Sequence, residues 1–309
     1  MSTNAKGTVL KKLFGTNKSV LIYAWVTGVI IFYMANGMRY VVSSPLQIDS
    51  FKLVPLPAFS DGKGVPSTSA DYHNVPFDKN DKRATEPLVR LDKYGIACDN
   101  FYARTDGFNA PYYRSFESAS RKGRIRESLA LKLQKINDML NDSGLELLVF
   151  DAYRPVACQY ELWSYFLSRA KSENPKASEA EAIALASRYC SNPDKFTPSD
   201  WHTWPSHCTG GAVDLTLRRK DNGEQLFMGS IFDDDSPVSH SAYFETVSPL
   251  TASARAARDN RRILYWAMKQ VGFENYPYEW WHFDYGDQLW VLDSKNAQIN
   301  KAFYGAAGK

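Results

Sequence analysis

The sequence predicts an α+β fold, a small antiparallel sheet with flanking helices, preceded by one N-terminal transmembrane helix. Helix-like and strand-like segments follow one another from about residue 86 to the end of the 309-residue chain. Two strand-like segments are joined by the turn Asp221-Asn222-Gly223, which is typical of an antiparallel hairpin. A long uncharged segment lies near the N-terminus. Helices that come before, between and after a hairpin are typical of the α+β class.

The N-terminal apolar segment is long enough to cross a bilayer. Val20 to Met38 contains no charged residue, and a bilayer core of roughly 30 Å requires about twenty apolar residues in a helix. Four lysines precede the segment. Because lysine favours the cytoplasmic side, we expect residues 1–18 to be cytoplasmic, 19–43 to be an uncleaved anchor, and the rest to lie on the extracytoplasmic (periplasmic) side. A cleaved signal peptide and a buried core helix are the alternatives.

Residues 44–85 have the composition of a linker. Pro, Ser, Gly, Asp and Lys are frequent, and the apolar residues show no sustained period. We expect a tether or an extension that follows the surface of the domain at residues 86–309. His73 lies in this linker and has no assigned role.

The first strong element of the domain is an amphipathic helix between residues 124 and 143. Five apolar residues recur on one face at helical spacing, namely Ile125, Leu129, Leu133, Ile136 and Leu140. Gly144 is placed to end this helix as a C-terminal cap. The later elements follow in order along the chain: a strand at 145–153, helices at 154–170 and 179–190, the hairpin at 211–228, a helix at 254–273 and a strand at 278–285.

Composition argues against several classes of protein and site. The formal net charge of +3 gives no electrostatic case for nucleic acid as a partner, and no protein partner is predicted. No two cysteines form a CxxC pair, so a thiolate zinc site is not expected. Four scattered cysteines fit buried thiols or one or two disulfides: Cys98, Cys158, Cys190 and Cys208.

His207 and Asp214 are the first candidates for a metal site. They are seven positions apart across a Gly-Gly pair, so a turn from a loop into a strand would aim both at one point. Catalytic zinc takes His nitrogen and carboxylate oxygen, with three protein ligands and an open position. Candidates for the third ligand are many carboxylates and the other histidines outside the linker: His202, His240 and His282. An ordinary turn entering a strand is the alternative.

Glu279 and His282 add a second pattern. A Glu three residues before a His is found in zinc hydrolases, where the His binds the metal and the Glu moves protons beside it. The alternative is that "YEWWHFDY" is an aromatic core strand with a hydrogen-bonded histidine.

Three motifs together resemble a known family. They are D-x-Y-R-P at 151–155, H-x-x-G-x-A-x-D at 207–214 and E-W-W-H at 279–282. With "KYGIACDNF" at 93–101 and "MGSIFD" at 228–233, they resemble in order the VanX-type zinc D-alanyl-D-alanine dipeptidases, which share a fold with hedgehog signalling domains. The resemblance implies one zinc ion per chain, held by His207, Asp214 and His282. It implies Glu279 as general acid and base, and Arg154 as the group that stabilises the transition state.

The resemblance also matches Tyr94 and Asp233 to positions that line the substrate pocket. It departs at Pro205, where the family commonly has serine two residues before the first zinc histidine, so dipeptide specificity is open here. The implied activity is zinc-dependent hydrolysis of short peptides, D-Ala-D-Ala or a related D-amino-acid dipeptide, in cell-wall peptide metabolism. The alternatives are a carboxypeptidase acting on peptidoglycan stem peptides and a non-catalytic zinc-containing module that binds the cell wall. Expected partners are a small dipeptide or cell-wall peptide and, through the N-terminal helix, the membrane.

Overall fold

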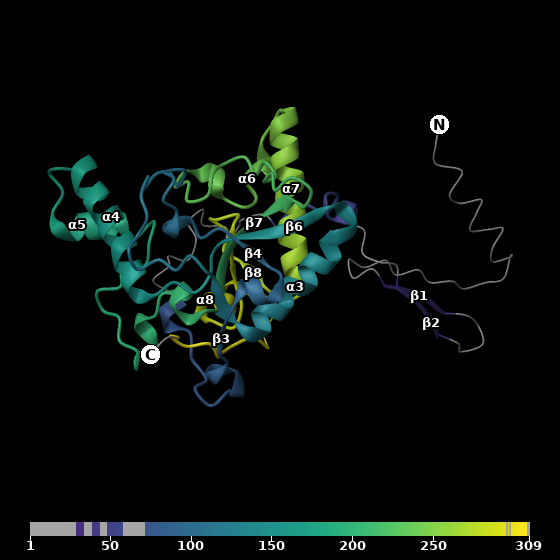
Figure 1. The fold of residues 1–309 in the computed structure, drawn as a ribbon, viewed down its shortest axis with the longest axis horizontal. Helices are drawn as coiled ribbons and strands as arrows, with labels where there is room; N and C mark the ends of the chain where they lie inside the picture. The colour runs from purple at the N-terminus through teal and green to yellow at the C-terminus, as the bar shows by residue number, and fades with distance from the viewer. Residues whose placement is uncertain are drawn as a thin grey trace. The chain divides into compact units, whose positions relative to one another are not determined.

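The computed structural model describes residues 29–33, 39–43, 48–57, 72–294, 296 and 298–307. The chain divides into two compact units, Met1–Gln47 and Ile48–Lys309. In the first unit, strands β1 (Val29–Tyr33) and β2 (Arg39–Ser43) pair antiparallel. The second unit contains every other element described below (Figure 1).

The predicted membrane-spanning helix is not found in the described part of its segment. Residues 29–33 and 39–43 are strands, and their sequences VIIFY and RYVVS are rich in the β-branched and aromatic residues that favour strands. An apolar run alone does not separate a strand from a buried helix. Among the described residues no helix is long and apolar enough to cross a bilayer. The rest of the predicted anchor at 19–43, and the predicted cytoplasmic segment at 1–18, lie outside the described residues.

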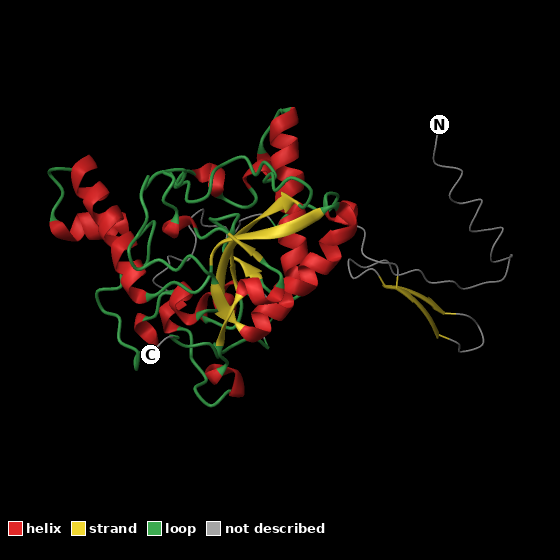
Figure 2. Ribbon diagram, in the orientation of Figure 1, coloured by secondary structure: helices red, strands yellow, loops and turns green. Residues whose placement is uncertain are grey.

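A five-stranded sheet forms the centre of the second unit (Figure 2). Its strand order is β4-β6-β7-β9-β8, and every pair is antiparallel except β4 with β6. The predicted antiparallel sheet is therefore found with one parallel edge pair. Its strands are β4 (Ala97–Cys98), β6 (Leu145–Asp151), β7 (Ala212–Arg219), β8 (Glu274–Asn275) and β9 (His282–Asp284). A separate two-stranded sheet pairs β3 (Leu88–Arg90) with β5 (Arg124–Arg126).

The predicted hairpin at 211–228 is shorter than expected. The chain turns back after β7, but its return segment pairs with β7 only near the turn. The contacts are the bridge between Arg218 and Gln225 and the backbone hydrogen bonds from Arg219 to Glu224 and from Leu226 to Leu217. The rest of this edge of β7 is paired with β9, at Ala212–Asp214. Next to the candidate metal ligands, β7 is therefore paired with the distant strand β9 and not with the adjacent return segment of the hairpin.

The predicted helices are present. α3 (Glu127–Leu140) buries four of the five expected apolar residues, and Ile125 is buried in β5 just before it. Gly144 has φ 66°, as expected of a glycine that ends a helix. α3 packs against β6, and α7 (Ala252–Gln270) packs against β7 and α3. The remaining α-helices are α2 (Ile48–Phe51), α4 (Val156–Glu173), α5 (Glu179–Ala186), α6 (Tyr243–Thr246) and α8 (Gln288–Asp293).

Described parts of the predicted linker pack on the domain. Ile48 and Phe51 of α2 are buried, and α2 contacts α7. The indole nitrogen of Trp266 in α7 donates to the carbonyl of Val54 at 3.0 Å. Tyr72, in a short 3-10 turn, is 1% exposed and lines the pocket described below. These residues follow the surface of the domain and contribute to its core.

Candidate metal centre

Three acidic and imidazole side chains come from one row of the sheet. Asp151 of β6 lies opposite Asp214 of β7, and Asp214 lies opposite His282 of β9. Residues directly opposite on neighbouring strands project from the same face of a sheet. The pairing of three strands far apart in sequence therefore gathers these side chains on one face.

His207 reaches the same point from a short 3-10 turn, Ser206–Thr209, that leads into β7. Gly210 ends this turn with φ 72°, a conformation that costs a residue with a Cβ atom. A Cβ atom on Gly211 would lie 2.7 Å from the backbone oxygen of Tyr285. The Gly-Gly pair thus permits both the reversal of the chain and its close approach to the strand end. This is why His207 and Asp214, seven residues apart, meet.

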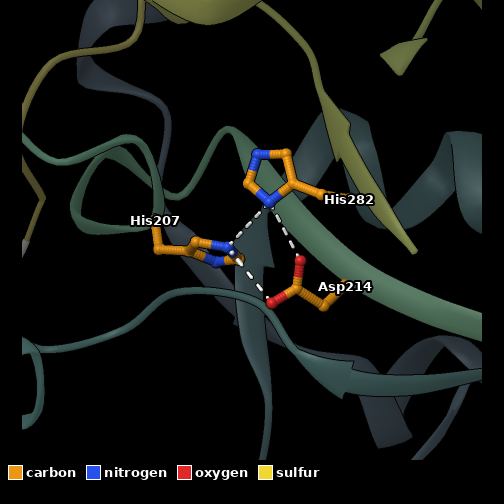
Figure 3. Close-up of side chains that lie close together, drawn as sticks. All are labelled: His207, Asp214 and His282. Carbon is orange, nitrogen blue, oxygen red and sulfur yellow. Dashed lines mark hydrogen bonds and ion pairs between the residues drawn. The ribbon is translucent and has the colours of Figure 1, made fainter. Parts of the chain in front are cut away.

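The ligand atoms of His207, Asp214 and His282 converge (Figure 3). Nε2 of His207 is 3.2 Å from Nδ1 of His282, which is 3.0 Å from Oδ1 of Asp214. Nε2 of His207 is 3.3 Å from Oδ2 of Asp214. A tetrahedral zinc ion with bonds of about 2.05 Å would separate its ligand atoms by about 3.3 Å. The three buried side chains therefore fit zinc in both chemistry and spacing.

The outward-facing nitrogens of both histidines are also held. Nδ1 of His207 lies 2.8 Å from the carbonyl oxygen of Ala152, to which only a protonated nitrogen can donate. Nε2 of His282 lies 3.1 Å and 3.0 Å from the two oxygens of Asp284, which is fully buried. Each partner assigns the proton to the outer nitrogen and leaves the inner one to bind metal. Burial alone would raise the pKa of Asp214, but the two imidazoles hold it well below its ordinary value.

We expect Asp284→Asn to weaken zinc binding about 10–100-fold, because it removes the carboxylate that orients His282 and raises its basicity. Titration of the metal-free protein with zinc against a competing chelator measures the change. Asp200→Asn is the matched control, since Asp200 contacts His202 at 2.8 Å on the exposed surface. If Asp284→Asn binds zinc as tightly as the unmodified protein, Asp284 does not support zinc binding through His282.

Glu279 lies beside the ligand cluster. A tight turn holds it there: its backbone N–H donates to the carbonyl of Tyr276, and the amide of Asn275 donates to the carbonyls of both Glu279 and His282. Its Oε2 is 3.8 Å from Nδ1 of His282. Burial raises the pKa of Glu279 to about 7. A carboxyl group with a pKa near the working pH is suited to both accept and release a proton.

Arg154 is buried next to the ligand Asp214. Its Nε donates to Asp151 at 2.8 Å, one terminal nitrogen to Gln159 at 2.9 Å, and the other to the hydroxyl of Tyr102 at 3.2 Å. Nη2 also lies 3.6 Å from Oδ2 of Asp214. One N–H of Nη1 has no hydrogen-bond partner among the described residues. The guanidinium is thus fixed in place and still has a donor to offer.

A pocket joins these groups. Its lining includes the predicted ligands and catalytic residues together with Asp233: Arg154, His207, Asp214, Asp233, Glu279 and His282. Tyr72, Gln159, Pro205 and residues 187–191 form further parts of its wall. Asp233 lies in the loop before the 3-10 turn Pro237–Ser239. The structure therefore brings six of the seven predicted site residues into one cavity.

Tyr94 is the predicted site residue that does not reach the pocket. Its hydroxyl donates to Glu127 at the start of α3, at 2.6 Å, and it is not part of the pocket lining. It ends a short 3-10 turn, Leu91–Tyr94, and Gly95 then reverses the chain with φ 67°. Two other tyrosines, Tyr102 and Tyr112, donate instead to Asp233. They lie in aromatic-rich segments that the sequence alone does not separate from core.

The other candidates of the sequence lie elsewhere. His202 is paired with Asp200, His240 contacts the ring of Tyr278, and neither lines the pocket. All four cysteines are free thiols. Residues that sequence reasoning missed are Asp151, Gln159, Tyr102, Tyr112 and Asp284. Of these, Asp151 had a signal as the first residue of the D-x-Y-R-P motif, and Asp284 as a carboxylate two residues after a candidate zinc histidine.

The family model and the individual relatives that match this chain all describe D-Ala-D-Ala dipeptidases. Residues 93–302 match the Peptidase_M15 model, described as D-ala-D-ala dipeptidase. The chain is 33% identical over 181 residues to a D-alanyl-D-alanine dipeptidase of Synechocystis, covering 52% of this chain and 68% of that one. It is 31% identical over 201 residues to the D-alanyl-D-alanine dipeptidase of Enterococcus faecium, and the match covers 63% of this chain and 88% of that one. It is 34% identical over 142 residues to the D-alanyl-D-alanine dipeptidase of Escherichia coli, and the match covers 46% of this chain and 56% of that one. Because the family model matches more than half of the chain, this protein belongs to the D-Ala-D-Ala dipeptidase family of metallopeptidases.

Proposed function

We propose that this protein is a zinc peptidase that hydrolyses D-Ala-D-Ala or a related short D-amino-acid peptide of cell-wall metabolism. The observation that carries the proposal is one pocket that holds a complete zinc donor set, a carboxyl group with a pKa near 7 and a fixed arginine. The relatives are D-alanyl-D-alanine dipeptidases, which supports this choice of substrate.

Each residue has a defined task in peptide hydrolysis. When bound to His207, Asp214 and His282, zinc supplies Lewis acidity that polarises a carbonyl and makes water a better nucleophile. Glu279 takes the proton from the attacking water and passes it to the leaving amine. Arg154 donates to the oxygen on which negative charge develops.

Asp233 gives the pocket a further carboxyl group in addition to Asp214 and Glu279. We assign it to the substrate's free ammonium group, because a carboxylate at hydrogen-bond distance is the natural partner of an amine. A binding module would need neither Glu279 nor Arg154, so their presence in the pocket favours an enzyme. The cavity is small, about 90 Å³, which favours a short peptide over a polymer.

The test is a panel of substrates given to the zinc-loaded full chain: D-Ala-D-Ala, L-Ala-L-Ala, and a stem pentapeptide that ends in D-Ala-D-Ala. We expect D-Ala-D-Ala to have the highest kcat/KM. If the protein instead releases D-Ala preferentially from the pentapeptide, its activity is that of a carboxypeptidase and not of a dipeptidase. If the fully zinc-loaded protein hydrolyses none of the three peptides, it is a binding module and not an enzyme.

We also propose that the domain acts on the extracytoplasmic side of a membrane. The support is in the sequence: the uncharged segment at 20–38 follows four lysines. We expect a reporter enzyme that is active only after export to work when fused after residue 309, and the fusion to stay with the membrane fraction. A fusion partner that is active only in the cytoplasm serves as the control. Release of the full chain into the soluble fraction on cell breakage would contradict membrane attachment.

A further inference from the structure

Asp233 is held by two tyrosine hydroxyls on the same oxygen. The hydroxyl of Tyr102 and the hydroxyl of Tyr112 each donate to Oδ2 of Asp233 at 2.9 Å. Oδ1 accepts no hydrogen bond from the part of the chain that the structure describes, and Asp233 lines the pocket. One oxygen is therefore committed to the protein and the other is available to a bound molecule.

The backbone conformation of Asp233 needs supporting contacts, which these two hydrogen bonds provide. Asp233 has φ 59°, one of two residues other than glycine with positive φ in the described chain, and such a conformation persists only where surrounding contacts maintain it. The two hydroxyls supply such contacts. Burial raises the pKa of Asp233 to about 7, and the two hydroxyl donors oppose that rise by favouring the charged form.

Both tyrosines are themselves rigid. Tyr102 is 2% exposed, and its ring stacks on Phe116 with the ring centroids 5.5 Å apart. Tyr112 is 5% exposed and meets the edge of Tyr165, with the centroids 4.7 Å apart. Such packing restricts the rotation of each ring. The hydroxyl positions are therefore fixed before any substrate arrives.

Tyr102 also connects Asp233 to the catalytic arginine. Its hydroxyl accepts a hydrogen bond from Arg154 at 3.2 Å while it donates to Asp233, and its ring lies 4.7 Å from the guanidinium carbon. Tyr112 has no such link, because its hydroxyl reaches Asp233 alone among the described residues. The two hydroxyls are therefore expected to differ in effect: Tyr112 on substrate binding, and Tyr102 on both binding and turnover.

We propose that Tyr102 and Tyr112 are positioning residues that hold Asp233 with one oxygen directed into the pocket to receive the substrate's ammonium group. This inference rests on the proposed function, in which Asp233 binds that group. The two tyrosines thus determine selectivity for short peptides with a free amino terminus.

Tyr112→Phe in the full, zinc-loaded chain tests the inference, since it removes one hydroxyl and keeps the ring. We expect KM for D-Ala-D-Ala to rise about tenfold with kcat within about twofold, the size of one hydrogen bond to a charged group. Tyr102→Phe should raise KM similarly and also lower kcat. Tyr165→Phe is the matched control, because its hydroxyl donates to the carbonyl of Pro111 at 3.3 Å within the same aromatic cluster. It should leave both constants unchanged.

A double-mutant cycle separates positioning from a general loss of structure. In the background of Asp233→Asn, Tyr112→Phe should change kcat/KM by less than about twofold, since the charge that it positions is absent. An equal loss in both backgrounds would overturn the inference, as would an unchanged KM in Tyr112→Phe of an active enzyme. An unmodified protein that hydrolyses no peptide would instead overturn the proposed function, and this inference with it.

Discussion

Glu279→Ala is expected to keep zinc and lose most turnover. The three ligands remain, so zinc should still bind at about one ion per chain. The attacking water then has no base and the leaving amine has no acid, and general acid–base groups contribute about 10²–10⁴-fold to rates. KM should change less than kcat, because the missing interaction belongs to the transition state. Steady-state kinetics on D-Ala-D-Ala, with zinc content measured on the same samples, checks both expectations.

Two further variants strengthen the Glu279 experiment. Glu279→Gln keeps the size of the side chain and should be as inactive as Glu279→Ala, since an amide cannot accept the proton. Glu224→Ala changes an exposed glutamate in the turn after β7 and should retain full activity. If Glu279→Ala kept more than about a tenth of the activity, Glu279 would not be the base, even though the family assignment would stand.

His207→Ala and His282→Ala are each expected to abolish stoichiometric zinc binding and, with it, activity. The ligands come from the turn before β7, from β7 and from β9, so bound metal also stabilises the fold. At zinc 1,000-fold above its Kd, binding contributes about 4 kcal/mol to the free energy of unfolding. Loss of that contribution corresponds to a fall in Tm of about 10 °C for a domain of this size. Thermal melting with and without added zinc measures it.

His202→Ala is the matched control for the ligand variants, because His202 is an exposed histidine paired with Asp200 outside the pocket. It should keep its zinc and show the same zinc-dependent rise in Tm as the unmodified protein. Unchanged zinc content in either His207→Ala or His282→Ala would mean that the replaced histidine is not a ligand.

Much of the domain could be predicted because local pattern and tertiary packing agree there. The face of α3 follows directly from apolar residues at helical spacing, and the cap at Gly144 follows from a glycine after that face ends. The meeting of His207 and Asp214 was also accessible, since a Gly-Gly pair between two candidate ligands indicates a sharp turn. That His282 joins them depends on the pairing of β7 with β9, which no local pattern specifies.

The remaining differences have physical causes of the same kind. At 29–33 and 39–43 an apolar run was compatible with either helix or strand, and these residues form strands. Tyr94 and Tyr102 lie eight positions apart in one aromatic-rich segment. Only the three-dimensional path of the chain decides that Tyr102 faces Asp233 and Tyr94 faces Glu127. Strand pairing likewise decides that Asp151 lies opposite Asp214, beside the metal ligands.

The central claim, a zinc peptidase for D-Ala-D-Ala, is tested most directly by release of D-alanine from D-Ala-D-Ala through a cycle of metal removal and return. The purified protein should hydrolyse the dipeptide, lose activity after treatment with a chelator, and regain it in proportion to zinc added back, up to about one ion per chain. Protein that regains its full zinc and still releases no D-alanine would contradict the account, as would protein whose activity is unaffected by complete removal of the metal.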